Sequence, residues 1–121
     1  MYRLTNKLLF SILTLISTSV FSLELTPTEI TLNPNKPIVL ANTNPKKITL
    51  LCEVHVASSA KHHVSINVIA GKGIFNGTTF KQGDSLISAM NHMQQIPVSA
   101  DPGTKAQVTN LGPNIMKIIC G

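Results

Sequence analysis

Two cysteines constrain the fold of this chain more than any other feature, because each belongs to a run of alternating apolar residues. The first run places Ile48, Leu50, Cys52, Val54 and Val56 at alternate positions, and the second does the same for Met116, Ile118 and Cys120. Side chains of a β-strand point to opposite faces with a period of two, so each cysteine lies on the apolar face of a strand. We therefore expect a disulfide between Cys52 and Cys120, buried between two sheets, with the rest of the chain arranged around it.

The surroundings of the cysteines favour a structural bridge over a reactive or metal-binding thiol. Neither cysteine belongs to a Cys-x-x-Cys pair, and both have isoleucine, leucine or valine as neighbours. Reactive thiols are found in electropositive, partly exposed surroundings, which these runs do not provide. Two cysteines normally pair in an oxidising compartment, so the bridge also predicts export from the cytoplasm.

The first 22 residues have the three parts of a secretory signal peptide. Arg3 and Lys7 form a basic start, residues 8–16 form an apolar run, and Val20 and Ser22 are suited to signal peptidase. The apolar run of nine residues is far shorter than the roughly twenty residues that a bilayer-spanning helix needs. We therefore expect cleavage after Ser22 and a mature domain of residues 23–121 without a stable membrane anchor. The predicted location is secreted or periplasmic.

The charge pattern of residues 23–121 argues against a nucleic-acid partner. Eight lysines and five acidic residues give this segment a formal net charge of +3, and it contains no arginine. Arginine is the residue best suited to bidentate contact with phosphates and base edges. Only two phenylalanines are available for base stacking, whereas single-strand binders use rows of aromatic side chains.

Turn signals separate short alternating runs at intervals of roughly ten residues, which is typical of a β-sandwich or barrel. Asn76-Gly77 is the strongest hairpin signal, because a type I′ turn needs positive φ at both central residues. Residues 85–90 fit either a short helix or a strand. We predict an all-β fold with about seven to nine short strands. A bridge from an early strand to the last one favours a single immunoglobulin-like antiparallel sandwich, although the tryptophan common in that family is missing.

Two groups of histidine and methionine are candidates for a metal site. His55 and His63 would approach each other on an outward face if their strands paired as a hairpin. Met90, His92 and Met93 combine thioether and imidazole, the ligands that select cuprous copper. Histidines without a ligand pattern are more often exposed polar residues, and methionine is more often core filler. No cofactor is predicted.

Catalytic motifs are missing from the chain. It has no Gly-x-Ser-x-Gly, phosphate loop or His-Glu-x-x-His. Glu53 and His55 share the outward face of one strand, so a hydrolase would need folding to bring a serine to them. We expect a protein that is not an enzyme.

Several short segments resemble those of short exported bacterial β-sandwich proteins of largely unknown function. The matching segments are residues 45–52, 73–77, 101–103 and 108–112, together with Cys120. The resemblance implies export, a β-sandwich and a secreted role in host interaction, and it adds no site residues.

The sequence therefore predicts a non-enzymatic exported β-sandwich that binds an unidentified protein, as a host- or envelope-interaction module. An exposed strand edge or the loops would make the contact, because free edges invite pairing with a partner strand. The alternative is a periplasmic copper or zinc binding protein that uses the histidines and methionines named above.

Overall fold

The computed structural model describes residues 21–24, 28–57 and 62–121, and these residues form eleven β-strands and no helix. The strands are β1 (Phe21–Glu24), β2 (Thr28–Leu32), β3 (Ile38–Ala41), β4 (Ile48–Val56), β5 (His62–Ala70), β6 (Lys72–Phe75), β7 (Thr78–Lys81), β8 (Ser85–Met90), β9 (Gln95–Ala100), β10 (Lys105–Asn110) and β11 (Met116–Cys120). None of the described residues belongs to a helix long and apolar enough to span a bilayer. The predicted signal peptide lies outside the described residues, apart from Phe21 and Ser22 in β1.

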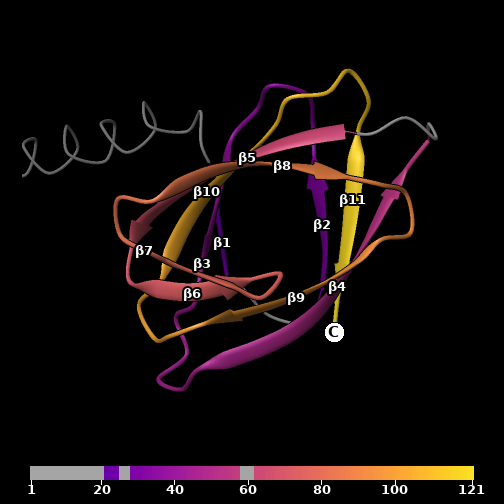
Figure 1. The fold of residues 1–121 in the computed structure, drawn as a ribbon. Helices are drawn as coiled ribbons and strands as arrows, with labels where there is room; N and C mark the ends of the chain where they lie inside the picture. Colours follow the sequence, from indigo (N-terminus) through magenta and orange to yellow (C-terminus); the bar gives the residue numbers. More distant parts are fainter. Residues whose placement is uncertain (1–20, 25–27, 58–61) are drawn as a thin grey trace, which may run out of the picture.

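The strands form two sheets, which confirms the predicted β-sandwich. One sheet has the order β2-β11-β4-β9-β6-β7 and the other has the order β1-β3-β10-β5-β8 (Figure 1). Neighbouring strands are antiparallel except for β1 and β3, which run parallel. There are more strands than the seven to nine expected, because residues 21–32 form two strands and both arms of the Asn76-Gly77 hairpin are strands.

The order of the strands is that of a jelly roll. β2 pairs with β11, β3 with β10, β4 with β9 and β5 with β8, so each pair encloses the next pair in the sequence. The chain changes sheet at every step from β2 to β5 and again from β8 to β11. In the expected immunoglobulin-like order, by contrast, the first two strands share a sheet. Alternation of apolar residues defines strands and their faces, but it contains no information about which distant strands pair.

The predicted disulfide is present, and its place in the sandwich differs from the expected one. Cys52 and Cys120 are bonded, and both are buried on the inner face of their sheet. They lie directly opposite each other on β4 and β11, which are neighbours in the six-stranded sheet. The bridge therefore links two strands within one sheet and does not join the two sheets.

Two buried asparagines make hydrogen bonds between the sheets. Asn110, at the end of β10, donates through Nδ2 to the carbonyl of Leu32 in β2 at 3.0 Å. Asn42, just after β3, donates through Nδ2 to the carbonyl of Ala100 in β9 at 2.9 Å. Both side chains are almost inaccessible to solvent. Because buried amides are stable only when hydrogen-bonded, these contacts fix the two ends of the sandwich.

The apolar residues of the alternating runs fill the space between the sheets. Leu32, Val54, Val64 and Met116 are completely buried. The Asn76-Gly77 turn has the predicted conformation, with φ of 50° and 86°. Residues 85–90, for which a helix was also considered, form strand β8.

Candidate functional site

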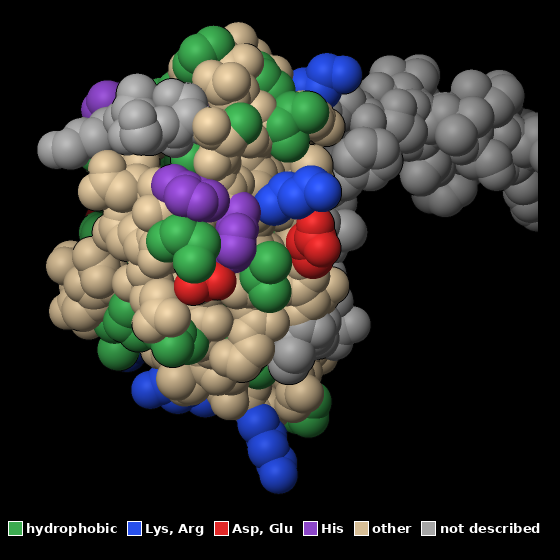
Figure 2. Space-filling model, turned by 90° about the vertical axis from the view of Figure 1, so that its right-hand side faces the viewer, with side chains coloured by type: hydrophobic (Ala, Val, Ile, Leu, Met, Phe, Trp, Pro, Cys, Tyr) green, Lys and Arg blue, Asp and Glu red, His purple; other side chains and the backbone are tan. Residues whose placement is uncertain are grey.

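The outer face of the six-stranded sheet gathers several polar residues that the sequence singled out. In β4, Leu51, Glu53 and His55 alternate with buried residues and therefore point outward. On the neighbouring strand β11, Ile119 lies opposite Glu53 and Lys117 lies opposite His55. We define the β4 face by its outward residues: Glu29, Leu51, Glu53, His55, His92, Lys117 and Ile119. Figure 2 shows histidine, lysine, acidic and hydrophobic side chains gathered on one side of the molecule.

Leu51 and Ile119 are the apolar part of this face. Their exposed fractions are 49% and 45%. They belong to neighbouring strands and are diagonal to each other, since Ile119 is opposite Glu53 and Leu51 is two residues away from Glu53. Diagonal neighbours in a sheet are within reach of long aliphatic side chains. Each of them also adjoins a bridged cysteine in the sequence, so the disulfide lies directly beneath the apolar part of the face.

Glu53, His55 and His92 form a polar cluster beside the two aliphatic residues. Glu53 Oε1 and His55 Nε2 are 2.8 Å apart, and each side chain is about one-third exposed. The ring centroids of His55 and His92 are 5.7 Å apart, in an edge-to-face arrangement. His92 Nδ1 accepts a hydrogen bond from the backbone N–H of Val56 at 3.1 Å. A neutral His92 ring therefore carries its proton on Nε2, which is left as a donor.

The turn between β8 and β9 places His92 beside β4. Met93 has a positive φ of 70°, and its backbone N–H donates to the carbonyl of Val54 at 2.6 Å. The side chain of Gln94 accepts from the N–H of Asn91 at 2.9 Å, which closes the turn. The turn is therefore bonded directly to β4.

Lys117 and Glu29 form an ion pair at the other side of the β4 face. The distance between Lys117 Nζ and Glu29 Oε2 is 3.5 Å, and both side chains are at least half exposed. Exposed ion pairs of this kind contribute little to stability, about 0–1 kcal/mol. The pair therefore adds little stability, and its main effect is to place charge at the margin of the face.

The structure separates some of the predicted metal ligands and brings others together. Met90 is buried in the core, whereas Met93 is 51% exposed, so these two thioethers do not share one environment. His63 lies on β5, in the other sheet from His55, and the hairpin on which their approach depended does not form. The residues that do meet are His55 and His92, one from each predicted set. Among the described residues, no group of three or more His, Cys, Asp and Glu could hold a metal ion.

Sequence reasoning missed the two exposed aliphatic residues, although a signal was present. Leu51 and Ile119 are the apolar residues at the outward positions of the two cysteine runs. An apolar residue at an outward position is normal when it is isolated, but it indicates a binding surface when another exposed apolar residue adjoins it. The contact between His55 and His92 had no comparable signal, because it depends on the pairing of β4 with β9.

Comparison with known proteins shows no established family for this chain. No protein-family model and no curated protein matches it. One similar solved structure is PliG from Aeromonas hydrophila, a periplasmic inhibitor of g-type lysozyme. It has 9% identity and a TM-score of 0.25, with 84% of this chain and 97% of that chain covered. Another is a de novo designed double-stranded β-helix, with 16% identity and a TM-score of 0.21, covering 78% of this chain and 96% of that one. Both TM-scores are too low to bear on function.

Proposed function

We propose that this protein is a non-enzymatic, exported binding module that contacts a partner protein through the β4 face. The observation that carries the proposal is the diagonal placement of Leu51 and Ile119 on neighbouring strands of one sheet, since both are large aliphatic side chains and nearly half exposed. Exposed apolar side chains surrounded by polar ones have the composition of a protein interface, with an apolar centre and a polar margin.

The polar margin of the β4 face would supply specificity. The Glu53–His55 pair lies between the two aliphatic residues and His92, and the Lys117–Glu29 pair borders Ile119. Charged groups at the margin of an interface select the partner and its orientation more than they add affinity. A complementary partner would present an apolar centre together with hydrogen-bonding groups that match these pairs.

The disulfide supports the proposal in two ways. It bonds β4 to β11 directly beneath Leu51 and Ile119, so the two strands that carry the apolar centre hold a fixed register. A pre-organised surface loses less entropy when it binds. A disulfide also fits an oxidising compartment, in agreement with the predicted signal peptide and with the resemblance to exported bacterial proteins. We therefore propose that the protein acts in the periplasm or outside the cell.

The proposal is tested by partner capture with matched surface variants. The oxidised protein, Leu51→Asp and Ile87→Asp would each be used to recover proteins from envelope and host-cell extracts, with quantitative mass spectrometry. Ile87 is a suitable control because it is 65% exposed and lies on β8 of the other sheet. We expect a specific protein that is lost with Leu51→Asp and retained with Ile87→Asp. Equal recovery by both variants, or no enrichment by the unaltered protein, would contradict the proposal.

A weak metal site is the second candidate function. The observation that favours it is the 5.7 Å separation of the His55 and His92 rings. Metal binding at His92 would compete with the present hydrogen bonding, because its Nδ1 already accepts from Val56. Calorimetric titration with Zn²⁺ and Cu⁺ tests this candidate. Saturable binding that His92→Ala removes and His63→Ala preserves would support it, and no saturable binding would exclude it.

A further inference from the structure

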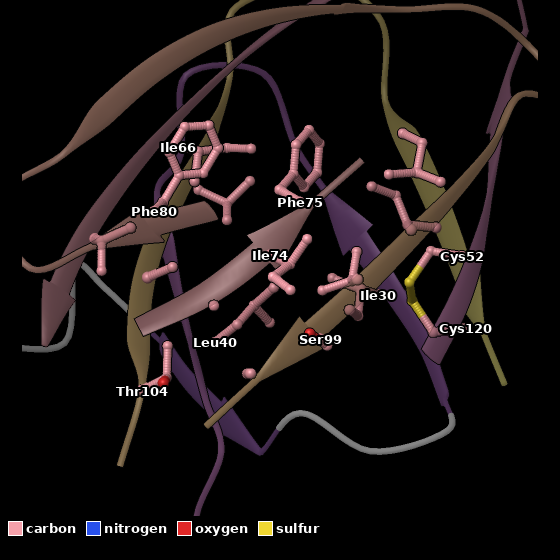
Figure 3. A pocket seen from close by; sticks show the side chains of 18 of the residues that line it. Ile30, Leu40, Cys52, Ile66, Ile74, Phe75, Phe80, Ser99, Thr104 and Cys120 are labelled. Carbon is pink, nitrogen blue, oxygen red and sulfur yellow. A yellow bond between two sulfur atoms is a disulfide. The ribbon is translucent and has the colours of Figure 1, made fainter. Parts of the chain in front are cut away.

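An apolar cavity of about 120 Å³ lies between the two sheets. Its walls come from both sheets and include Leu40 of β3, Ile66 of β5, Met90 of β8 and Val98 of β9. The rings of Phe75 and Phe80 form another part of the wall, and Figure 3 shows them among aliphatic side chains with the disulfide at one side. The cavity and the β4 face are thus on opposite sides of the six-stranded sheet.

The chemistry of the wall restricts what the cavity can hold. Among the described residues that line it, none has a charged side chain, and the side-chain hydroxyls are those of Ser99 and Thr104. The Thr104 hydroxyl is already occupied, since it donates to the carbonyl of Lys72 at 2.7 Å and accepts from the N–H of Lys72 at 3.1 Å. The Ser99 hydroxyl is left without a partner among the described residues, but a charged or sugar-like molecule would lose far more hydration than this single group could replace.

The hairpin of β6 and β7 offers a route into the cavity. Phe75 and Phe80, on its two strands, are only partly buried, and Ile74, which precedes Phe75 in β6 and also lines the cavity, is 37% exposed. The hairpin joins the rest of its sheet through the pairing of β6 with β9, and β7 is the last strand of that sheet. An outward movement of this hairpin would therefore be opposed mainly by the β6–β9 pairing and by the hydrogen bonds of Lys72 and Asn76 at the two ends of β6.

We propose that the cavity binds a compact, neutral, apolar molecule about the size of benzene, which enters beside the β6–β7 hairpin. An engineered apolar cavity of roughly 150 Å³ in another protein remains dry and binds benzene, so a cavity of this size and lining suits a similar molecule. Such a ligand would gain dispersion contacts that the walls of an empty cavity lack. The volume is too small for a long acyl chain.

The test uses toluene as the probe and two matched alanine variants. Ala106 lines the cavity, whereas Ala89 is exposed on β8, so Ala106→Leu fills the space and Ala89→Leu leaves it unchanged. At ten times its dissociation constant, toluene should raise the Tm of the unaltered protein and of Ala89→Leu by about 5 °C. The same concentration should leave the Tm of Ala106→Leu unchanged. No rise in the unaltered protein, or an equal rise in Ala106→Leu, would overturn the proposal.

Methyl NMR of the unaltered protein keeps the proposal testable if Ala106→Leu does not fold. Val98 and Ala106 line the cavity, whereas Val54 and Val64 are buried core residues outside its lining. Toluene should shift the methyl signals of the first pair in a saturable manner and change those of the second pair little. Equal shifts in both pairs, or no saturable shift, would overturn the proposal.

Discussion

Cys52 and Cys120 lie directly opposite each other on neighbouring strands, with their Cα atoms 4.0 Å apart. Leu51 precedes Cys52 and Gly121 follows Cys120, and the backbone N–H of each of these two residues donates to the carbonyl of the other. The cysteines therefore occupy a non-hydrogen-bonded pair of the ladder, the position at which opposite Cα atoms come closest. The disulfide fixes the register of β4 and β11, and with it the spacing of Leu51 and Ile119 on the outer face.

Removing the disulfide should strongly destabilise the domain. The bridge closes a loop between residues 68 apart in the sequence, which the chain-entropy model values at about 4 kcal/mol. We expect the Cys52→Ala, Cys120→Ala double variant to lower the free energy of unfolding by about 2–5 kcal/mol. Urea unfolding measures the difference, and fully reduced unaltered protein should behave like the variant. A double variant as stable as the oxidised protein would show that the bridge does not form in solution.

Gly71 should tolerate alanine much less well than Gly83. Both have positive φ, 78° and 95°, so alanine is strained at either position. At Gly71 an added Cβ would also lie 2.6 Å from the Cα of Thr104, whereas at Gly83 it would meet nothing within 4 Å. We expect Gly83→Ala to cost about 1–2 kcal/mol and Gly71→Ala about 1–3 kcal/mol more. Thermal and urea unfolding of both variants give the comparison, and equal losses would mean that Thr104 moves aside freely.

The faces of the strands could be predicted from the sequence, because burial in a sheet repeats with a period that is visible in the chain. Cys52 and Val54 in β4, and Met116 and Cys120 in β11, are buried as the alternation requires. The Asn76-Gly77 hairpin could also be predicted, because its signal is local. Strand pairing is not local, and so the adjacency of β4 and β11 and the jelly-roll order became visible only in the structure.

For the candidate site, as for the fold, local features could be predicted from the sequence and contacts between distant residues could not. His55 was assigned to an outward face by alternation alone, and it lies there. Its neighbour His92 is 37 positions further along the chain and reaches it because β9 pairs with β4. Met90 was considered a metal ligand from its distance to His92 in the sequence, but the pleat directs it into the core. Sequence spacing therefore identified the residue types, and tertiary pairing decided which of them meet.

Two buried hydroxyls should respond oppositely to substitution. Ser99 Oγ is buried and has no hydrogen-bond partner among the described residues, whereas Thr104 Oγ1 bonds to both the N–H and the carbonyl of Lys72. Ser99→Ala removes an unpaired polar atom and should leave the free energy of unfolding unchanged or raise it by about 1 kcal/mol. Thr104→Val keeps the shape but removes the hydrogen-bond partner of the Lys72 N–H, which should cost about 1–3 kcal/mol. Urea unfolding compares the two variants. If Ser99→Ala lowered the free energy of unfolding as much as Thr104→Val, the difference in hydrogen bonding between the two hydroxyls would be refuted.

Asn110 should be sensitive even to an isosteric change, because its amide is one of the hydrogen-bonded links between the sheets. Its Nδ2 donates to the carbonyls of Leu32 and Asn114, at 3.0 Å and 2.7 Å, and the side chain is completely buried. Asn110→Asp would bring a carboxylate against both carbonyl oxygens. An unpaired buried charge costs about 3–5 kcal/mol, so we expect a loss of that size in urea unfolding at neutral pH. Asn91→Asp, at an exposed position, should change stability by less than about 0.5 kcal/mol. If both variants lose equally little, Asn110 does not link β10 to β2 in solution.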